Sequence, residues 1–365
     1  MNNLLIRVLL VAVCVATIGC RNSGNSNRRT VSEGEKISFR HARLLNVTKR
    51  GGEIEIVVRN PWDTLSVLSV TRVKIPVSKV CAYSSVHASL LTELGCQHTI
   101  KGLCDVQYLT DTVMKDAVSK GEIADLGSSI QPDVEHIVAS GADILLTSPH
   151  EGSAIDGKIA STGIPVLACA DYMEISPLAR AEWIRLFGIL VGKENMADSI
   201  FDAVEKRYNE LKMMASKSSH RPTLLAEQPY QGVWHVPCGG STSGILYADA
   251  GADYIFADLD GAGSQSVGVE TILERGMNAD LWLIKSFGPL GRQDIIRDNP
   301  ALRPIKAELL VCNTMVNDYY GETPFHPDLI LENLVAIFHP DLGINPRKTY
   351  FAKLPTTLPG LRPTE

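Results

Sequence analysis

Residues 142–170, ADILLTSPHEGSAIDGKIASTGIPVLACA, contain two short runs of almost continuous apolar residues, at 143–147 and 163–170. A strand with one face in water alternates apolar and polar residues, whereas a strand covered on both faces is apolar throughout. A helical pattern at 134–140 precedes the first run. This alternation of short helices and apolar strands predicts an α/β lobe with a parallel sheet covered on both faces.

The same alternation extends in both directions along the chain. A strand pattern at 77–83 is followed by a helix at 86–94, and the strand and helix signals restart at 221 and continue to 338. Between them lies a helical stretch in which residues 196–217 would form one helix about 33 Å long. The sequence therefore predicts two Rossmann-like lobes with parallel sheets, joined by one long interdomain helix, with a ligand cleft between the lobes.

The N-terminus has the pattern of a secretory signal. Arg7 precedes an apolar run at 8–18 that ends at Gly19 and Cys20 and is too short to span a bilayer. A small residue followed by Cys resembles a bacterial lipoprotein lipobox, so Cys20 is predicted to carry acyl chains, which with more than one chain form a stable anchor. The alternative is a plain signal peptide with an incidental cysteine.

These patterns give a predicted division of the chain, with a hairpin between about 37 and 75 placed before the first lobe. The divisions are 1–20 lipoprotein signal peptide, 21–34 flexible tether, 35–175 N-terminal lobe including the hairpin, 176–218 helical connector, 219–345 C-terminal lobe, and 346–365 C-terminal tail.

Composition excludes several classes of protein. With 45% hydrophobic and 21% charged residues the chain is globular, and its net charge of -6 does not suit nucleic-acid binding. Six cysteines remain after Cys14 and Cys20, and none forms a C-x-x-C pair, so neither a zinc site nor a thioredoxin motif is indicated. Cys96 and Cys104 are close enough in sequence to form a disulfide, which the sequence leaves open.

The sequence contains no complete catalytic motif of the common classes. Residues 238–244, CGGSTSG, lack the lysine of a P-loop, and neither G-x-S-x-G nor H-E-x-x-H occurs in the chain. The sequence therefore predicts no catalytic residues and no enzyme. A secreted metal-dependent hydrolase on a similar two-lobe scaffold stays the alternative.

Several ordered segments resemble the periplasmic substrate-binding proteins of ABC importers for iron complexes, haem and cobalamin, in the class whose two lobes share a helical backbone. The resemblance covers about residues 75–345 and departs from the family at Ala142, where proline is usual, and in the hairpin before the first lobe. The segments that carry it are VCAY at 80–83, PDVE at 132–135, ADILL at 142–146, GIPV at 163–166, VGVE at 267–270, NADLWLI at 278–284, FHPD at 325–328 and IFHP at 337–340.

The resemblance implies a monomeric binding protein with limited hinge motion, anchored to a bacterial membrane on its periplasmic side. Its implied partners are a permease with its ATPase and a metal-chelate ligand, with no resident cofactor or metal and no nucleic acid. Family members use one carboxylate on each lobe to pair with permease arginines, and the matching residues are Glu135 and Glu270. Alternatively, both carboxylates only complement the positive end of a helix.

Candidate cargo-binding residues follow the predicted strands, where aromatic and polar side chains gather. Aromatic planes with polar tips suit a flat ligand such as a corrin or porphyrin, although some of these rings could fill lobe cores instead. Trp234 in particular could begin a buried strand at 232–236. No arginine cluster occurs at the strand ends, which favours cobalamin, haem or a neutral hydroxamate over a catecholate. The candidates are Tyr83, Ser84, His150, Tyr172, Tyr230, Trp234, Phe287 and Tyr320.

Overall fold

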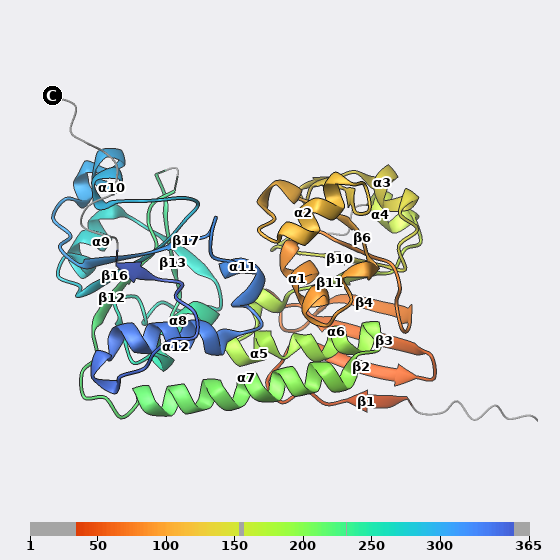
Figure 1. Cartoon of the computed structure of the whole chain (residues 1–365), viewed down its shortest axis with the longest axis horizontal. Helices are drawn as coiled ribbons and strands as arrows, with labels where there is room; N and C mark the ends of the chain where they lie inside the picture. Colours follow the sequence, from red (N-terminus) through yellow and green to blue (C-terminus); the bar gives the residue numbers. More distant parts are fainter. Residues whose placement is uncertain (1–33, 153–156, 231, 354–365) are drawn as a thin grey trace, which may run out of the picture. The chain divides into compact units, whose positions relative to one another are not determined.

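The sheet predicted around residues 143–147 is a five-stranded parallel sheet in the order β11-β10-β5-β6-β7 (Figure 1). The structure is a computed structural model that describes residues 34–152, 157–230 and 232–353. Strand β10 has neighbours on both sides, and Ile144, Leu145 and Leu146 are buried, which explains the continuous apolar run. The strands are β5 (Val80–Ala82), β6 (Ile100–Leu103), β7 (Ala124–Asp125), β10 (Ile144–Thr147) and β11 (Val166–Ala168).

Short helices connect these strands, as the alternating pattern predicts. The first begins after Ser84, whose backbone is extended and whose hydroxyl accepts the N–H of Val86, the usual role of a serine N-cap. The elements are α1 (Ser85–Glu93), η1 (Gln97–Thr99), η2 (Val106–Tyr108), α2 (Thr112–Ser119), β8 (Gly127–Ser128), β9 (Gln131–Pro132), α3 (Val134–Ala139), α4 (Gly157–Ser161) and η3 (Asp171–Met173).

A second, antiparallel sheet precedes this lobe. The predicted hairpin is present as β2 (Leu45–Arg50) and β3 (Glu53–Arg59), and the structure extends it with β1 (Glu35–Ile37) and β4 (Val67–Lys74). One face is buried through Ile54, Ile56 and their neighbours, and the other faces water. The sequence missed the two outer strands because β1 is only three residues long and β4 has no tight turn before it.

Two buried carboxylates attach this antiparallel sheet to the connector. Glu182 accepts the backbone N–H groups of residues 40–42 at 2.6–2.9 Å, and Glu174 accepts those of residues 43–44 at 2.9–3.1 Å. Glu174 also accepts the indole N–H of Trp183 at 3.0 Å. Burial raises the pKa of the Glu174 carboxyl, while these hydrogen bonds oppose the rise. The pair fixes where the β1–β2 connection lies.

The connector consists of α5 (Pro177–Ala181), α6 (Trp183–Val191) and α7 (Glu194–Ala215). Helix α6 ends at Gly192, whose φ of 69° is in the left-handed region that favours glycine at a helix end. A Cβ at Gly188 would lie 2.5 Å from the Cβ of Ala197, so glycine allows α6 and α7 to pack closely. Helix α7 has 22 residues, about 33 Å, and packs on α6 near one end and on α12 near the other (Figure 1). The predicted long helix is confirmed.

The C-terminal lobe contains a second five-stranded sheet, in the order β14-β12-β16-β17-β18. Four strands are parallel, but the edge strand β18 is antiparallel to β17, so this sheet is mixed rather than fully parallel. Its strands are β12 (Thr223–Ala226), β14 (Asp253–Tyr254), β16 (Leu281–Ser286), β17 (Glu308–Asn313) and β18 (Ala352–Lys353), and a separate pair is formed by β13 (Trp234–Pro237) and β15 (Ser264–Val267). The helices are α8 (Thr242–Asp249), α9 (Val269–Gly276), α10 (Arg292–Asp298), η4 (Pro300–Leu302), α11 (Tyr319–Glu322), α12 (Pro327–Phe338) and η5 (Pro340–Leu342).

Residues 346–353, which the sequence analysis assigned to a tail, belong to this lobe. Tyr350 and Phe351 are 2% exposed, and Asn333 of α12 accepts both of their backbone N–H groups. The chain then joins the sheet as β18. The sequence did not reveal this because the segment docks on an edge of β17 that only the folded lobe presents.

All six cysteines of the described residues are free and buried, so the disulfide left open between Cys96 and Cys104 is absent. Within the same residues, no helix is both long and apolar enough to cross a membrane. The predicted signal peptide, Cys20 and the tether up to residue 33 lie outside the described part of the chain.

Trp234 lies in the core of the C-terminal lobe. Its ring is 1% exposed, stacks on Trp282 with centroids 5.8 Å apart, and donates its indole N–H to the carbonyl of Ala226 at 3.1 Å. The exposed cleft position predicted for Trp234 is therefore wrong, and the alternative of a buried strand describes its position. The local pattern, with Val233 and Val236 beside the tryptophan, fits either environment.

We expect Trp234→Ala to lower the free energy of unfolding by about 3–5 kcal/mol, because it removes a large ring from a closely packed core. Urea unfolding of the purified variant measures the loss. Val316→Ala is the control, since Val316 is 77% exposed and should change stability by less than about 0.5 kcal/mol. Equal stability of the two variants would contradict the buried position.

Candidate functional site

A cavity of about 150 Å³ lies between the two lobes. The N-terminal lobe contributes the start of α1 and the segment from η2 to α2, and the C-terminal lobe contributes the ends of β16 and β17 and helix α11. We call it the inter-lobe cavity. It lies where strands of the C-terminal sheet end, the position expected for a ligand site in such sheets. Its lining residues are Ser85, Ser89, Tyr108, Leu109, Thr110, Asp111, Met114, Phe287, Thr314, Asn317, Asp318, Tyr320 and Gly321.

Side chains from the two lobes meet at this cavity. The hydroxyl of Thr110 donates to Asp318 at 2.8 Å, and the rings of Tyr108 and Phe287 contact edge to face with centroids 6.1 Å apart. Tyr108 and Phe287 are nevertheless 60% and 67% exposed. Exposed rings at the meeting point of two lobes offer apolar surface to a ligand.

A second cavity, also about 150 Å³, lies between the connector and the C-terminal lobe. We call it the connector cavity. Tyr320 lines both cavities, so the two share one aromatic wall. The lining residues are Pro177, Arg180, Thr242, Ser243, Leu246, Lys285, Tyr319, Tyr320, Thr323, Pro324, Pro327 and Ile330.

The charged residues that line the connector cavity are both basic. The guanidinium of Arg180 donates from Nε to Asp171 at 2.9 Å, and His87 contacts the other oxygen of Asp171 at 3.0 Å. Burial opposes the charge of Asp171, but Arg180 and His87 hold the pKa of its carboxyl below the usual value. The carboxylate thus lies behind the arginine, and only the cation lines the cavity.

Lys285 has a similar arrangement with Glu227. Burial works against the lysine charge, but Glu227 and nearby tyrosines raise the pKa of Lys285 well above its usual value. Glu227 has a φ of 67°, in the left-handed region, and its carbonyl accepts the indole N–H of Trp282 at 2.7 Å. Backbone strain of about 1–3 kcal/mol at a strand end is typical of functional positions, where the surrounding structure maintains it.

Among the predicted cargo residues, the structure brings Phe287 and Tyr320 together at the inter-lobe cavity. Neither of the two cavities includes the other candidates. Ser84 caps α1, Tyr83 is half-buried against the N-terminal lobe, and the hydroxyl of Tyr172 donates to the carbonyl of Pro149 at 2.7 Å. His150 and Tyr230 are exposed. A role in cargo binding stays a prediction for these five residues.

Several lining residues were not found from the sequence. The sequence shows no arginine cluster at the predicted strand ends, yet Arg180 of α5 and Lys285 of β16 line one cavity although they are 105 positions apart. The pairing of Thr110 with Asp318 spans 208 positions. No local pattern marks such pairs, because folding alone brings them together. Across the described ranges, no group of three His, Cys, Asp or Glu side chains is arranged to hold a metal ion.

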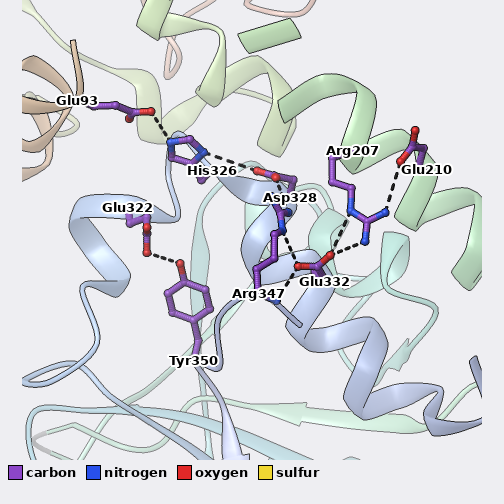
Figure 2. Close-up of polar contacts among 9 residues, drawn as sticks. All are labelled: Glu93, Arg207, Glu210, Glu322, His326, Asp328, Glu332, Arg347 and Tyr350. Carbon is purple, nitrogen blue, oxygen red and sulfur yellow. Dashed lines mark hydrogen bonds and ion pairs between the residues drawn. The ribbon is translucent and has the colours of Figure 1, made fainter. Parts of the chain in front are cut away.

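A charged network around α12 includes one contact between the lobes (Figure 2). His326, just before α12, contacts Glu93 of α1 at 2.6 Å and lies 3.8 Å from Asp328. Burial lowers the pKa of His326, but Glu93, Asp328 and Glu322 together outweigh this effect and raise the pKa above its usual value. Protonation of one side chain therefore strengthens a contact that joins the lobes.

The same network fixes the C-terminal segment to the long helix (Figure 2). Glu332 of α12 is 2% exposed and pairs with Arg207 of α7 and with Arg347, which also contacts Asp328 at 2.7 Å. Burial opposes the charge of Glu332, yet the two arginines lower its pKa. A paired, hydrogen-bonded carboxylate of this kind is strongly destabilised when one partner is removed.

Glu135 and Glu270 occupy equivalent positions in the two lobes. Each is exposed in the first turn of a helix, α3 for Glu135 and α9 for Glu270, and each helix follows a short strand. Their side chains are therefore available to a partner, as the predicted docking role requires. The role itself stays a prediction.

Comparisons with known proteins assign the family. The profile of the family described as periplasmic binding protein matches residues 107–308, more than half of the chain. The chain belongs to this family, which confirms the resemblance found in the sequence.

Two curated relatives are lipoproteins of Methanocaldococcus jannaschii. One is 29% identical over 76% of this chain and 69% of its own length, and the other is 22% identical over 95% and 98%. Both are described as uncharacterized lipoproteins. Neither description names a cargo.

Solved structures share the two-lobe fold at low sequence identity. A periplasmic heme binding protein from Pseudomonas aeruginosa is 17% identical, with a TM-score of 0.59 over 77% of this chain and 99% of its own. An ABC-type Fe3+-hydroxamate transport protein from Saccharomonospora viridis is 17% identical, with a TM-score of 0.59 over 78% and 98%. A petrobactin-binding protein from Bacillus subtilis is 14% identical, with a TM-score of 0.58 over 77% and 98%. The similarity confirms the predicted fold.

The contact between His326 and Glu93 predicts a pH dependence of stability. Because the folded protein raises the pKa of His326, the contact stabilises the fold most below about pH 6.5, the pKa of an unfolded histidine. This stabilisation is lost as the pH rises through the folded pKa. Glu93→Gln should therefore lower the free energy of unfolding by about 1 kcal/mol in acidic buffer and much less in alkaline buffer.

Urea unfolding of wild type and variant across pH measures this difference. Glu55→Gln is the matched control, because Glu55 pairs with Arg72, whose charge does not change in this range. A loss in Glu93→Gln that does not vary with pH would contradict the role of the histidine charge.

Proposed function

We propose that the protein is the substrate-binding component of an ABC importer, anchored in the membrane through lipid on Cys20 and facing the periplasm. Its cargo is a metal chelate: cobalamin, haem or a ferric siderophore. The observation that carries the proposal is the inter-lobe cavity, which is lined by aromatic side chains from both lobes in a member of the periplasmic binding protein family. The lipoprotein relatives support the anchor.

The size of the cavities limits how cargo can bind. Each is about 150 Å³, whereas pockets for drug-sized ligands measure about 300–1,000 Å³. A chelate would therefore need the lobes or the shared wall at Tyr320 to move apart. Tyr320 and Phe287 are 53% and 67% exposed and can provide flat apolar faces for it.

The basic lining of the connector cavity changes the expected charge of the cargo. The predicted strand ends carry no arginine cluster, which by itself favours neutral chelates. Arg180 and Lys285 both line a cavity next to the aromatic wall, so a carboxylate or other acidic substituent can be accommodated there. Acidic chelates therefore belong among the candidates. No observation favours the hydrolase alternative.

Titration with haemin, cyanocobalamin and a ferric hydroxamate tests the function directly. We expect one of these chelates to bind and to change its absorbance or the protein fluorescence. Phe287→Ala and Tyr320→Ala should each weaken that binding by about 1–3 kcal/mol, the scale of one aromatic contact. Ile130→Ala, a change at a residue 88% exposed on the β8–β9 hairpin, should have no effect. Absence of binding to every chelate in the panel would contradict the proposal.

The proposed docking role of Glu135 and Glu270 is tested by charge reversal. Glu135→Arg with Glu270→Arg should abolish cargo uptake in cells and leave cargo affinity unchanged, because like charges across an interface cost several kcal/mol. Glu122→Arg with Asp341→Arg is the matched control, with one exposed acidic residue changed in each lobe and neither of them on α3 or α9. Normal uptake by the first pair, or equal loss in the control, would exclude this docking surface.

A further inference from the structure

Charge is distributed very unevenly along the chain. Residues 34–79, which contain the antiparallel sheet, have nine Lys and Arg against four Asp and Glu, a net charge of +5. Residues 80–365 have 22 basic against 36 acidic residues, a net charge of -14. The antiparallel sheet is thus the basic part of an acidic protein. Local excess charge of this kind directs association with surfaces of opposite sign.

The outward face of this sheet carries much of that charge. Cross-strand pairs on it include Arg50 with Glu53, Glu53 with Lys74 and Glu55 with Arg72. The outward face therefore carries two acidic residues, Glu53 and Glu55, and five basic residues. Among the described residues, Arg50 and Arg59 form no ion pair. We call this surface the basic sheet face. Its basic residues are Lys36, Arg50, Arg59, Arg72 and Lys74.

A loop of seven residues, NPWDTLS at 60–66, joins β3 to β4 at the end of the sheet where Arg59 lies, and it includes one acidic residue, Asp63. Leu65 in this loop is 97% exposed, and Trp62 is only half-buried. The loop is ordered, because Asn60 accepts the N–H of Trp62 at 3.0 Å and donates to Ser66 at 3.0 Å. A tryptophan and an exposed leucine next to basic side chains are the combination found at the interface of a lipid bilayer.

The sheet is also the described part of the chain that is nearest in sequence to the proposed anchor at Cys20. Thirteen residues separate Cys20 from residue 34, where the description begins, and they can span at most about 45 Å. Three of them are arginines and one is a glutamate. A lipid on Cys20 would therefore keep the start of the sheet within about 45 Å of the headgroups, at high effective concentration.

We propose that the basic sheet face binds the anionic headgroups of the membrane that holds the lipid anchor, with the loop at Trp62 and Leu65 entering the interface. The inference rests on the lipid anchor of the proposed function. It gives the anchored protein a preferred orientation on the membrane. Glu135 and Glu270 lie on other elements, so binding to the headgroups and docking to a permease use separate surfaces.

Trp62 provides a specific reporter for the test. The other three tryptophans, Trp183, Trp234 and Trp282, are at most 1% exposed, so a quencher in the bilayer can reach only Trp62. The full lipidated chain is reconstituted into vesicles of phosphatidylcholine with brominated acyl chains, either alone or with about one third phosphatidylglycerol. We expect clear quenching in the anionic vesicles, little in the neutral ones, and reversal in about 0.5 M salt. Trp62→Phe should abolish the signal.

Charge variants identify the face. Each basic residue near an anionic surface changes the association constant for the membrane about fivefold. Arg50→Gln with Arg59→Gln should therefore weaken binding to the anionic vesicles about 25-fold and remove most of the quenching. Arg303→Gln with Lys306→Gln, an equal charge change at exposed residues of the C-terminal lobe, is the control and should leave quenching unchanged.

Three results would overturn the inference: equal quenching in neutral and anionic vesicles, no quenching in either, or equal loss in the control variant. Flotation with neutral vesicles tests the anchor separately. If the chain floats but shows no lipid-dependent quenching, only the headgroup-binding inference is excluded, and the proposed cargo binding still stands. If the chain does not float, both the lipid anchor and the headgroup-binding inference are excluded.

Discussion

The packing of α6 against α7 is the constraint on which the arrangement of the lobes depends. Gly188 lets the two helices approach closely, and α7 then continues for six turns to contact α12 in the other lobe. Helix α7 is continuous, so no loop interrupts the connection between its contacts with α6 and with α12. The ends of the C-terminal strands and the start of α1 therefore face the same cavity without a flexible linker.

Buried carboxylates strengthen this frame on both sides. Glu174 and Glu182 fix the antiparallel sheet to the connector, and Glu332 fixes the C-terminal segment to α7. Each carboxylate is buried and fully engaged, so each is a point where a single substitution would leave charge or backbone N–H groups without partners. Asp171 and Glu227 have a further effect, because they orient the two cations that line the connector cavity.

Much of the fold could be predicted from the sequence because its signals are local. The apolar run at β10 and the proline that begins α12 define elements by periodicity and chain geometry alone. Trp234 was misplaced because a tryptophan between valines suits a buried strand as well as an open loop. Strand β18 and the pairing of Arg180 with Lys285 in one cavity could not be predicted, since both depend on surfaces that exist only after folding. Of the site, the sequence therefore identified two aromatic residues, Phe287 and Tyr320, and missed the basic residues.

The free cysteines have a consequence for how the protein can mature. Burial raises the pKa of the Cys104 and Cys312 thiols to about 12, and it raises the pKa of the Cys169 thiol well above its usual value. Such thiols are almost never ionised, and the thiolate is the form that oxidants and disulfide exchange attack. None of the described cysteines is paired, so no disulfide contributes to the stability of the described part of the chain. Packing and hydrogen bonds alone hold that part of the fold, and its buried thiols resist oxidation.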